Sequence, residues 1–213
     1  MRKATIHLQA CDPVLAAIIK RVGPLRMPYR EPTFAALARS ITFQQLAGGA
    51  ASTIWGRVVD AAAPHIPPAE RLTKPDGFGH VTPASILALS ESEMRACGLS
   101  RQKLSYLRDL AARSASGEID FVQMPAWSDA EVMEHLTRVK GIGTWTAQMF
   151  LMFALRRRDI LPTGDYGVRS ALQRAYRMRT LPKPKRMEKI ASAWSPWRSV
   201  ACWYLWRSLD TKL

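Results

Sequence analysis

A short turn with two glycines, lying between two helical patterns, is the feature that most restricts how this chain can fold. The turn is Val139-Lys140-Gly141-Ile142-Gly143, and apolar residues recur at helical spacing before and after it. Glycines at alternate positions let the backbone turn sharply and come close to a ligand. The sequence therefore predicts two helices joined by a tight hairpin.

The start of the second helix of this hairpin is suited to binding an anion. The amides of Gly143, Thr144 and Trp145 would lack partners within the helix, and that helix end carries a partial positive charge. Thr144 and Thr146 add hydroxyl donors. The pattern favours a phosphate clamp, which positions a protein on DNA without reading sequence. The alternative is an ordinary turn in which the glycines only end a helix.

The charge of the chain points to a polyanionic partner. Over 213 residues, 31 Lys and Arg face 17 Asp and Glu, which gives a net charge of +14. Such an excess favours nucleic acid, and an unusual surface composition is the alternative. The 47% of hydrophobic residues are enough for a packed core.

The three cysteines, Cys11, Cys97 and Cys202, are far apart and form no Cys-x-x-Cys pair. They argue against a zinc site, a disulfide framework and an iron–sulfur cluster, so reduced thiols are expected. No signal peptide and no apolar run of membrane-spanning length are present. We therefore expect a cytoplasmic protein that is not secreted and contacts no membrane. With DNA as its partner, the expected location is the bacterial nucleoid.

Local signals predict an all-α protein of about ten short helices. Asp12 and Pro13 start one helix, and Ser90 and Ser128 each begin a capping box. The glycines after Gln44-Gln45 predict a break in the helical region 34–62. Prolines and glycines predict a loop over 64–81.

A single acidic residue, Asp165, follows the hairpin by 22 positions, within Pro162-Thr163-Gly164-Asp165-Tyr166. An N-cap of the next helix is its ordinary interpretation. The two roles are compatible, because a carboxylate at a helix N-terminus keeps its charge and can stabilise a developing cation.

Three ordered motifs carry a family resemblance. Residues 141–147 (GIGTWTA), 162–166 (PTGDY) and 194–199 (WSPWRS) resemble the helix-hairpin-helix DNA glycosylases, and within them the 3-methyladenine DNA glycosylase II branch. The match spans about 34–209. It implies two helical lobes around a cleft, divided as 1–33 (joining the C-terminal lobe), 34–135 and 136–213. The N-terminal β-rich domain of well-known members is expected to be absent, which would leave a more open site.

The resemblance implies that the enzyme flips an alkylated purine, such as 3-methyladenine or 7-methylguanine, out of duplex DNA and hydrolyses its N-glycosidic bond. Asp165 matches the essential aspartate. Bifunctional relatives place a nucleophilic lysine where this chain has Trp145, so no lyase activity is expected. Trp145 and Trp206 would line the base pocket, where a cationic base is held by stacking and cation–π contacts. Trp194, Trp197 and Trp203 are assigned mainly to the core.

The resemblance extends to a residue that fills the gap left by the flipped base. Gln44 and Gln45 occupy this place, and Gln45 stands where the 3-methyladenine DNA glycosylase II that the chain resembles has leucine. A surface glutamine pair is the alternative. The backbone carbonyls of Thr137, Val139 and Gly141 match positions that bind a monovalent cation, Na⁺ or K⁺. No cofactor is required, and a monomer acting on alkylated DNA is expected.

The sequence leaves two other functions open. A protein of the same fold could remove another base lesion, and a helix-hairpin-helix module could bind DNA without catalysis. Arg156-Arg157-Arg158 is either a solvated charge run or a source of backbone affinity.

Overall fold

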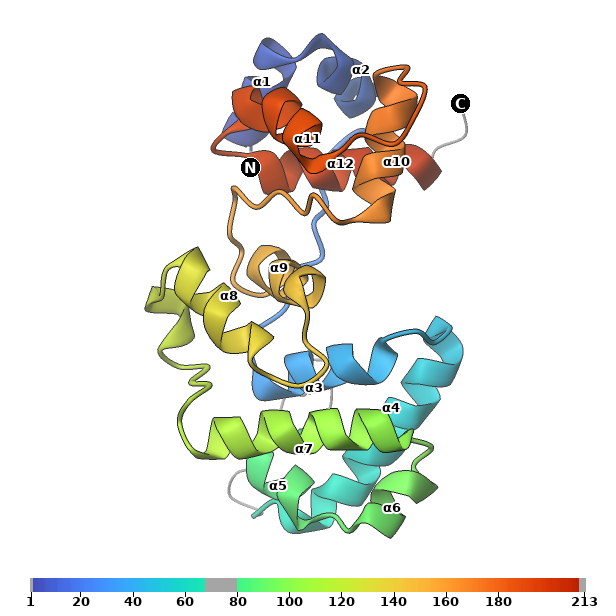
Figure 1. Cartoon of the computed structure of the whole chain (residues 1–213), viewed down its shortest axis with the longest axis vertical. Coiled ribbons are helices and arrows are strands. Elements are labelled where there is room, and N and C mark those ends of the chain that lie inside the picture. The colour runs from blue at the N-terminus through green and yellow to red at the C-terminus, as the bar shows by residue number, and fades with distance from the viewer. Residues whose placement is uncertain (1, 68–79, 211–213) are drawn as a thin grey trace. The chain divides into compact units, whose positions relative to one another are not determined.

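The computed structural model describes residues 2–67 and 80–210 (Figure 1). The described residues form helices and no strand, which confirms the all-α prediction. The α-helices are α1 (Arg2–Cys11), α2 (Pro13–Val22), α3 (Phe34–Phe43), α4 (Gly48–Ala62), α5 (Pro83–Ala88), α6 (Glu91–Ala96), α7 (Arg101–Ala115), α8 (Asp129–Thr137), α9 (Thr144–Phe153), α10 (Tyr166–Ala175), α11 (Pro184–Ala191) and α12 (Arg198–Asp210). Short 3-10 turns are η1 (Ala63–His65), η3 (Met124–Ala126) and η4 (Ser192–Trp194). Most of the predicted loop 64–81 lies outside the described residues.

The predicted helix starts agree with the structure because their signals are local. Ser90 and Ser128 each form a complete capping box with the glutamate three residues on. The break after Gln44 is also confirmed, since α3 ends at Phe43 and α4 begins at Gly48. Helix α1 was not predicted.

The chain divides into two compact units. The first comprises Met1–Tyr29 with Leu151–Leu213, and the second is continuous from Arg30 to Phe150. The structure thus groups the hairpin with the middle helices, whereas the prediction placed residues from 136 onward with the C-terminal helices. The N-terminal helices group with the C-terminal ones.

In the second unit, the long helix α7 packs against α3 and α5 (Figure 1). Its apolar stripe, Leu104, Leu107, Leu110 and Ala111, is buried as its helical spacing predicts. This packing forms the core that supports the hairpin.

In the first unit, α2 packs against α12, and the buried carboxylate of Asp12 fastens it to distant helices. Asp12 caps α2 through the amides of Val14 and Leu15. It also accepts hydrogen bonds from the hydroxyl of Tyr176 and, over 2.8 Å, from Nε1 of Trp194. One side chain therefore joins the start of α2 to the end of α10 and to η4.

Candidate active site and nucleic-acid interface

Asp165 is the N-cap of α10, and it is also the centre of a hydrogen-bonded site. Its side chain is buried, with 8% of the residue exposed. Oδ1 accepts hydrogen bonds from the amide of Val168 over 2.7 Å and from Nε1 of Trp206 over 2.8 Å. These two N–H donors hold Oδ1 in place at the N-terminus of α10. The N-cap role of Asp165 is therefore confirmed, and its catalytic role stays a prediction.

Trp206 reaches this carboxylate from α12. Its ring lies 6.0 Å from that of Phe153 with an interplanar angle of 31°. Gly167, in the first turn of α10, lies against both partners: a Cβ added there would be 2.8 Å from Trp206 Cδ1 and 3.1 Å from Asp165 Oδ1. Gly167 was not identified from the sequence. A glycine in the first turn of a helix, two positions after a candidate catalytic residue, is the signal that could have found it.

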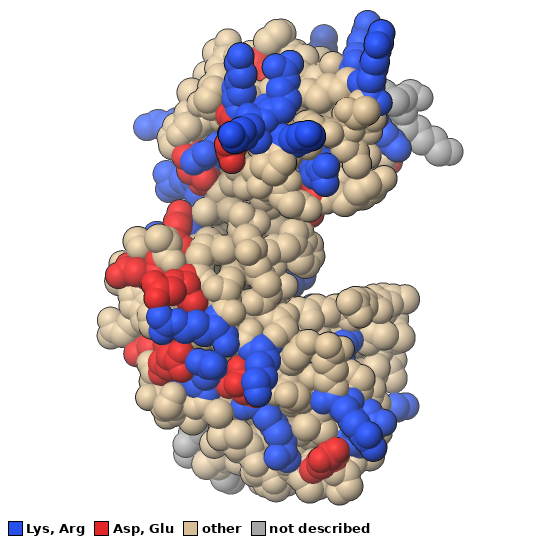
Figure 2. Space-filling model, in the orientation of Figure 1, with Lys and Arg blue, Asp and Glu red and all other residues tan. Residues whose placement is uncertain are grey.

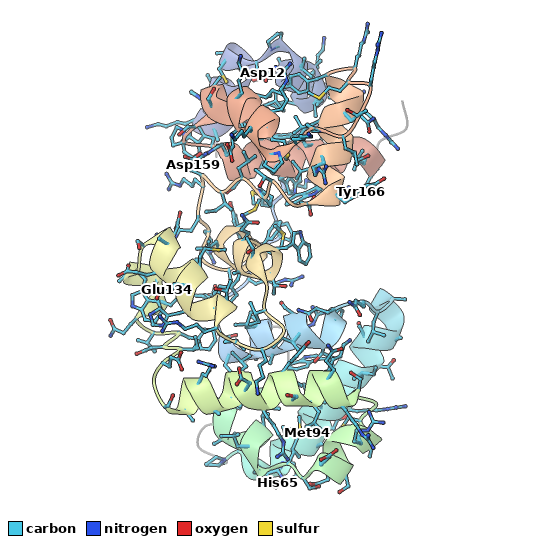
Figure 3. All side chains as sticks on the ribbon, viewed as in Figure 1. Asp12, His65, Met94, Glu134, Asp159 and Tyr166 are labelled. Carbon is cyan, nitrogen blue, oxygen red and sulfur yellow. The ribbon has the colours of Figure 1, made fainter. Side chains whose placement is uncertain are left out.

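The thiol of Cys202, which lies close enough to Asp165 to be affected by its charge, is not a competing nucleophile. Cys202 is fully buried, and this burial, with the nearby charge of Asp165, raises the pKa of its thiol far above its ordinary value. The thiol is therefore neutral and inert. Tyr166, next to Asp165, is 70% exposed at the start of α10 (Figure 3).

The third motif braces the segment that leads to Asp165. The guanidinium of Arg198 forms a two-pronged ion pair with Asp159, with both N–O distances at 2.8 Å, and Ser195 donates to the same carboxylate. Ser199 Oγ accepts from the amide of Ile160 and donates to the carbonyl of Arg157. Residues 157–160 are thereby tied to the start of α12. Burial alone would raise the pKa of Asp159, but the bonds from Arg198 and Ser195 hold that pKa below its ordinary value.

The other tryptophans of the C-terminal region agree with their assignment to the core. Trp194 and Trp203 are buried, and Trp197 is partly buried with Arg158 over its ring at 5.2 Å. Arg158 is therefore not only a solvated charge.

In the second unit, the hairpin joins α8 to α9. Its two glycines differ in backbone conformation and in the space around them. Gly141 has φ +79°, and a Cβ there would lie 2.0 Å from Cδ2 of Tyr106. Gly143 has no left-handed backbone, and a Cβ there would meet no atom within 4 Å. The fold thus explains the glycine at 141, and the close approach of a phosphate to Gly143 stays a prediction.

The hairpin is also held from outside. The amide of Lys140 donates to Asp109 Oδ2 over 2.8 Å, which fixes the turn to α7. Thr144 is exposed at the start of α9, whereas Thr146 is nearly buried. Trp145 is 50% exposed, which is unusual for an indole and leaves ring surface for a ligand.

The turn between α3 and α4 is braced against the hairpin. Gln44 Nε2 donates to the carbonyl of Gly141 over 2.9 Å and lies 3.5 Å from Thr146 Oγ1. Lys103 Nζ donates to the carbonyls of Thr42 and Gln44. The exposed tip then consists of Gln45, at φ +57°, and Leu46. Lys103 was not identified from the sequence.

The carbonyls predicted to hold a monovalent cation are only partly available. Val139 O accepts from the amide of Ile142 over 3.0 Å, and Gly141 O accepts from Gln44. Neither oxygen is an orphaned acceptor that calls for an ion, although a carbonyl has a second lone pair. Within residues 2–67 and 80–210, no cluster of His, Cys, Asp and Glu suits a metal ion. The cation stays a prediction.

Charge is distributed unevenly over the surface. On the face shown in Figure 2, acidic side chains gather over α8, whereas Lys and Arg side chains gather over the helices of the first unit. Helix α11 carries the exposed Lys185, Arg186 and Lys189. No helix in the described part of the chain is long and apolar enough to span a membrane.

Comparison with known proteins shows the family to which the chain belongs. Residues 38–196 match the HhH-GPD superfamily of base excision DNA repair proteins. The chain belongs to this superfamily. The matched range includes the braced turn, the hairpin, Asp165 and the first half of the third motif, so the sequence resemblance is confirmed at the level of the family.

Relatives within this superfamily are similar over nearly the whole chain. DNA-3-methyladenine glycosylase 1 of Schizosaccharomyces pombe is 32% identical, with 98% of this chain and 87% of the relative covered. The structure of a DNA-3-methyladenine glycosidase from Bacillus halodurans is 32% identical with a TM-score of 0.82, covering 98% of this chain and 89% of that one. The S. pombe 3-methyladenine DNA glycosylase, solved in complex with abasic DNA, has a TM-score of 0.77 and 32% identity, covering 96% and 95%.

Proposed function

We propose that this HhH-GPD protein is a monofunctional DNA glycosylase that removes alkylated purines, of the 3-methyladenine and 7-methylguanine type, from duplex DNA. The observation that carries the proposal is Asp165, a buried carboxylate held by two N–H donors at a helix N-terminus. The relatives named DNA-3-methyladenine glycosylase support the choice of lesion.

Asp165 would act on the sugar of the flipped nucleotide. As the N-glycosidic bond breaks, its electron pair leaves with the base, and positive charge develops on C1′ and the ring oxygen. The carboxylate stabilises this charge and orients the water that attacks C1′, accepting its proton. Because two donors fix the carboxylate in advance, little reorganisation is needed at the moment of reaction.

The substrate class follows from charge. A purine alkylated at N3 or N7 is cationic, and the electron pair of the broken bond neutralises it, so the base leaves without an acid to protonate it. Binding then depends on aromatic surface, which the half-exposed Trp145 and the partly buried Trp206 would supply, each contact contributing about 0.5–2 kcal/mol.

The position after the hairpin decides the class of catalysis. An amine there could attack C1′ and form a Schiff base, but Trp145 carries an indole, which is not a nucleophile. The product would therefore be an intact abasic strand. We propose duplex DNA as the partner, bound by a monomer through the hairpin amides, and no step requires a cofactor.

The test is release of 3-methyladenine from methylated duplex DNA under single-turnover conditions, comparing wild type with Asp165→Asn. Loss of release in the variant, with binding to abasic duplex retained, is expected. Equal rates in the two proteins would show that Asp165 is not catalytic. No release by wild type, with DNA binding intact, would favour a non-catalytic module, and release of another damaged base would favour a different lesion.

A further inference from the structure

The backbone conformation at position 167 does not explain why this residue is glycine. Its φ is outside the left-handed region, and it lies in the first turn of α10, where glycine is among the least favourable helix residues. Alanine would suit the helix better. The reason for glycine must therefore lie in what surrounds it.

The space beside Gly167 is occupied by the indole of Trp206 and the carboxylate of Asp165, which are hydrogen-bonded to each other. An added Cβ would lie 2.8 Å from Cδ1 and 3.0 Å from Nε1 of Trp206, and 3.1 Å from Asp165 Oδ1. The indole is rigid and packs on Phe153, so it cannot move aside as the end of a flexible chain would. A side chain at 167 would push the indole N–H away from the carboxylate.

Trp206 is well suited to orient a carboxylate. The indole N–H is a donor only, so it neither accepts a proton nor competes for one. With the amide of Val168, it places two donors from different helices on the same oxygen. One donor would leave the carboxylate plane able to swing, whereas two fix it.

We infer that Trp206 and Gly167 are positioning residues for Asp165: the indole N–H of Trp206 fixes the carboxylate, and the absent side chain of Gly167 is what lets the indole reach it. This inference rests on the proposed role of Asp165. It gives Trp206 a function separate from stacking on a base, and it gives Gly167 a role in catalysis without contact to substrate.

The test compares Trp206→Phe, which keeps an aromatic ring but removes the donor, with Gly167→Ala, which keeps the indole but displaces it. Gly56→Ala is the matched control, because Gly56 is also a helical glycine and an added Cβ there meets no atom within 4 Å. We expect both site variants to lower the single-turnover rate of 3-methyladenine release by about 10- to 100-fold. Affinity for abasic duplex should stay within about twofold of wild type.

A double variant distinguishes positioning from a general loss of packing. If both residues act through the same hydrogen bond, Gly167→Ala with Trp206→Phe should be no slower than Trp206→Phe alone. Wild-type rates in both single variants, or rate losses that multiply in the double variant, would overturn the inference.

A readout without activity separates this inference from the proposed function. The indole ¹H–¹⁵N NMR signal of Trp206, assigned by its loss in Trp206→Phe, should shift in Asp165→Asn and in Gly167→Ala but not in Gly56→Ala. If wild type releases no base, the proposed function fails, and the NMR signal still decides the contact. An unmoved signal in Asp165→Asn and Gly167→Ala overturns the inference even in an active enzyme.

Discussion

The side-chain amide of Gln44 donates to the backbone carbonyl of Gly141 over 2.9 Å, across 97 residues of sequence. The turn after α3 is therefore fastened to the hairpin by a hydrogen bond, and Lys103 holds the same turn from α7. Gln44 already has a partner inside the protein. Gln45 and Leu46 remain as the exposed candidates for filling a gap in DNA.

Substitutions in this turn should separate bracing from insertion. Gln44→Ala removes a partly buried hydrogen bond and should lower the free energy of unfolding by about 0.5–1.5 kcal/mol. Gln45→Ala or Leu46→Ala should leave stability nearly unchanged and weaken binding to abasic duplex by roughly three- to tenfold, because the gap is then unfilled. Urea denaturation and titration with abasic and intact duplexes measure the two effects. Unchanged abasic-site affinity in both tip variants would exclude them as the plug.

The two hairpin glycines should respond differently to alanine. Gly141→Ala forces a left-handed alanine against the Tyr106 ring and should cost about 2–4 kcal/mol of folding free energy. Gly143→Ala should change stability by less than about 0.5 kcal/mol. Its methyl group should nevertheless weaken DNA binding for all sequences alike, which titrations at physiological salt can measure. If Gly143→Ala binds DNA as tightly as wild type, the phosphate does not approach this backbone.

The ion pair of Asp159 with Arg198 should contribute stability that depends on pH. Because the folded pKa of Asp159 is held below its ordinary value, this contribution is complete above the unfolded pKa of about 3.9 and is lost as pH falls through the folded pKa. Asp159→Asn should thus lower the unfolding free energy by about 1–2 kcal/mol at pH 7, with a smaller difference from wild type below about pH 4.

Asp210→Asn serves as the control for this pair. Asp210 forms an exposed ion pair with Arg207, at 2.9 Å, which should contribute little at any pH. Urea denaturation at several pH values compares the three proteins. A deficit in Asp159→Asn that does not depend on pH would mean that the carboxylate charge is not the source of its effect.

The absence of an amine at position 145 predicts the product of the reaction. Borohydride added during turnover should trap no covalent protein–DNA complex, and the abasic strand should remain uncut until it is treated with alkali. Denaturing gels of labelled duplex test both points. A trapped complex would require a nucleophile elsewhere in the chain.

Much of the fold could be predicted because its signals are local. The caps at Ser90 and Ser128 and the break after Gln44 each depend on a few neighbouring residues. Helix α1 lacked such signals: it has no acidic residue in its first turn and no basic residue in its last. Its place depends on packing against α2 and η4, which residues 2–11 do not encode alone.

The site was less predictable because its contacts join distant residues. Asp165, Trp145 and the hairpin could be proposed from motifs, and Trp206 from resemblance. The hydrogen bond from Trp206 to Asp165 joins residues 41 positions apart in sequence. The contact of Gly141 with Tyr106 joins the hairpin to α7. Periodicity cannot show such pairs. Gly167 illustrates the limit, since its need for glycine arises only after α12 is in place.

The carboxylate of Asp12 also determines an order of events during synthesis. Its partners Tyr176 and Trp194 are made more than a hundred residues later, so α1 and α2 must wait on the order of ten seconds at about 5–20 residues per second. The unit from Arg30 to Phe150 is complete in sequence before then. The unit that holds Asp165 is therefore assembled last, around helices that left the ribosome first.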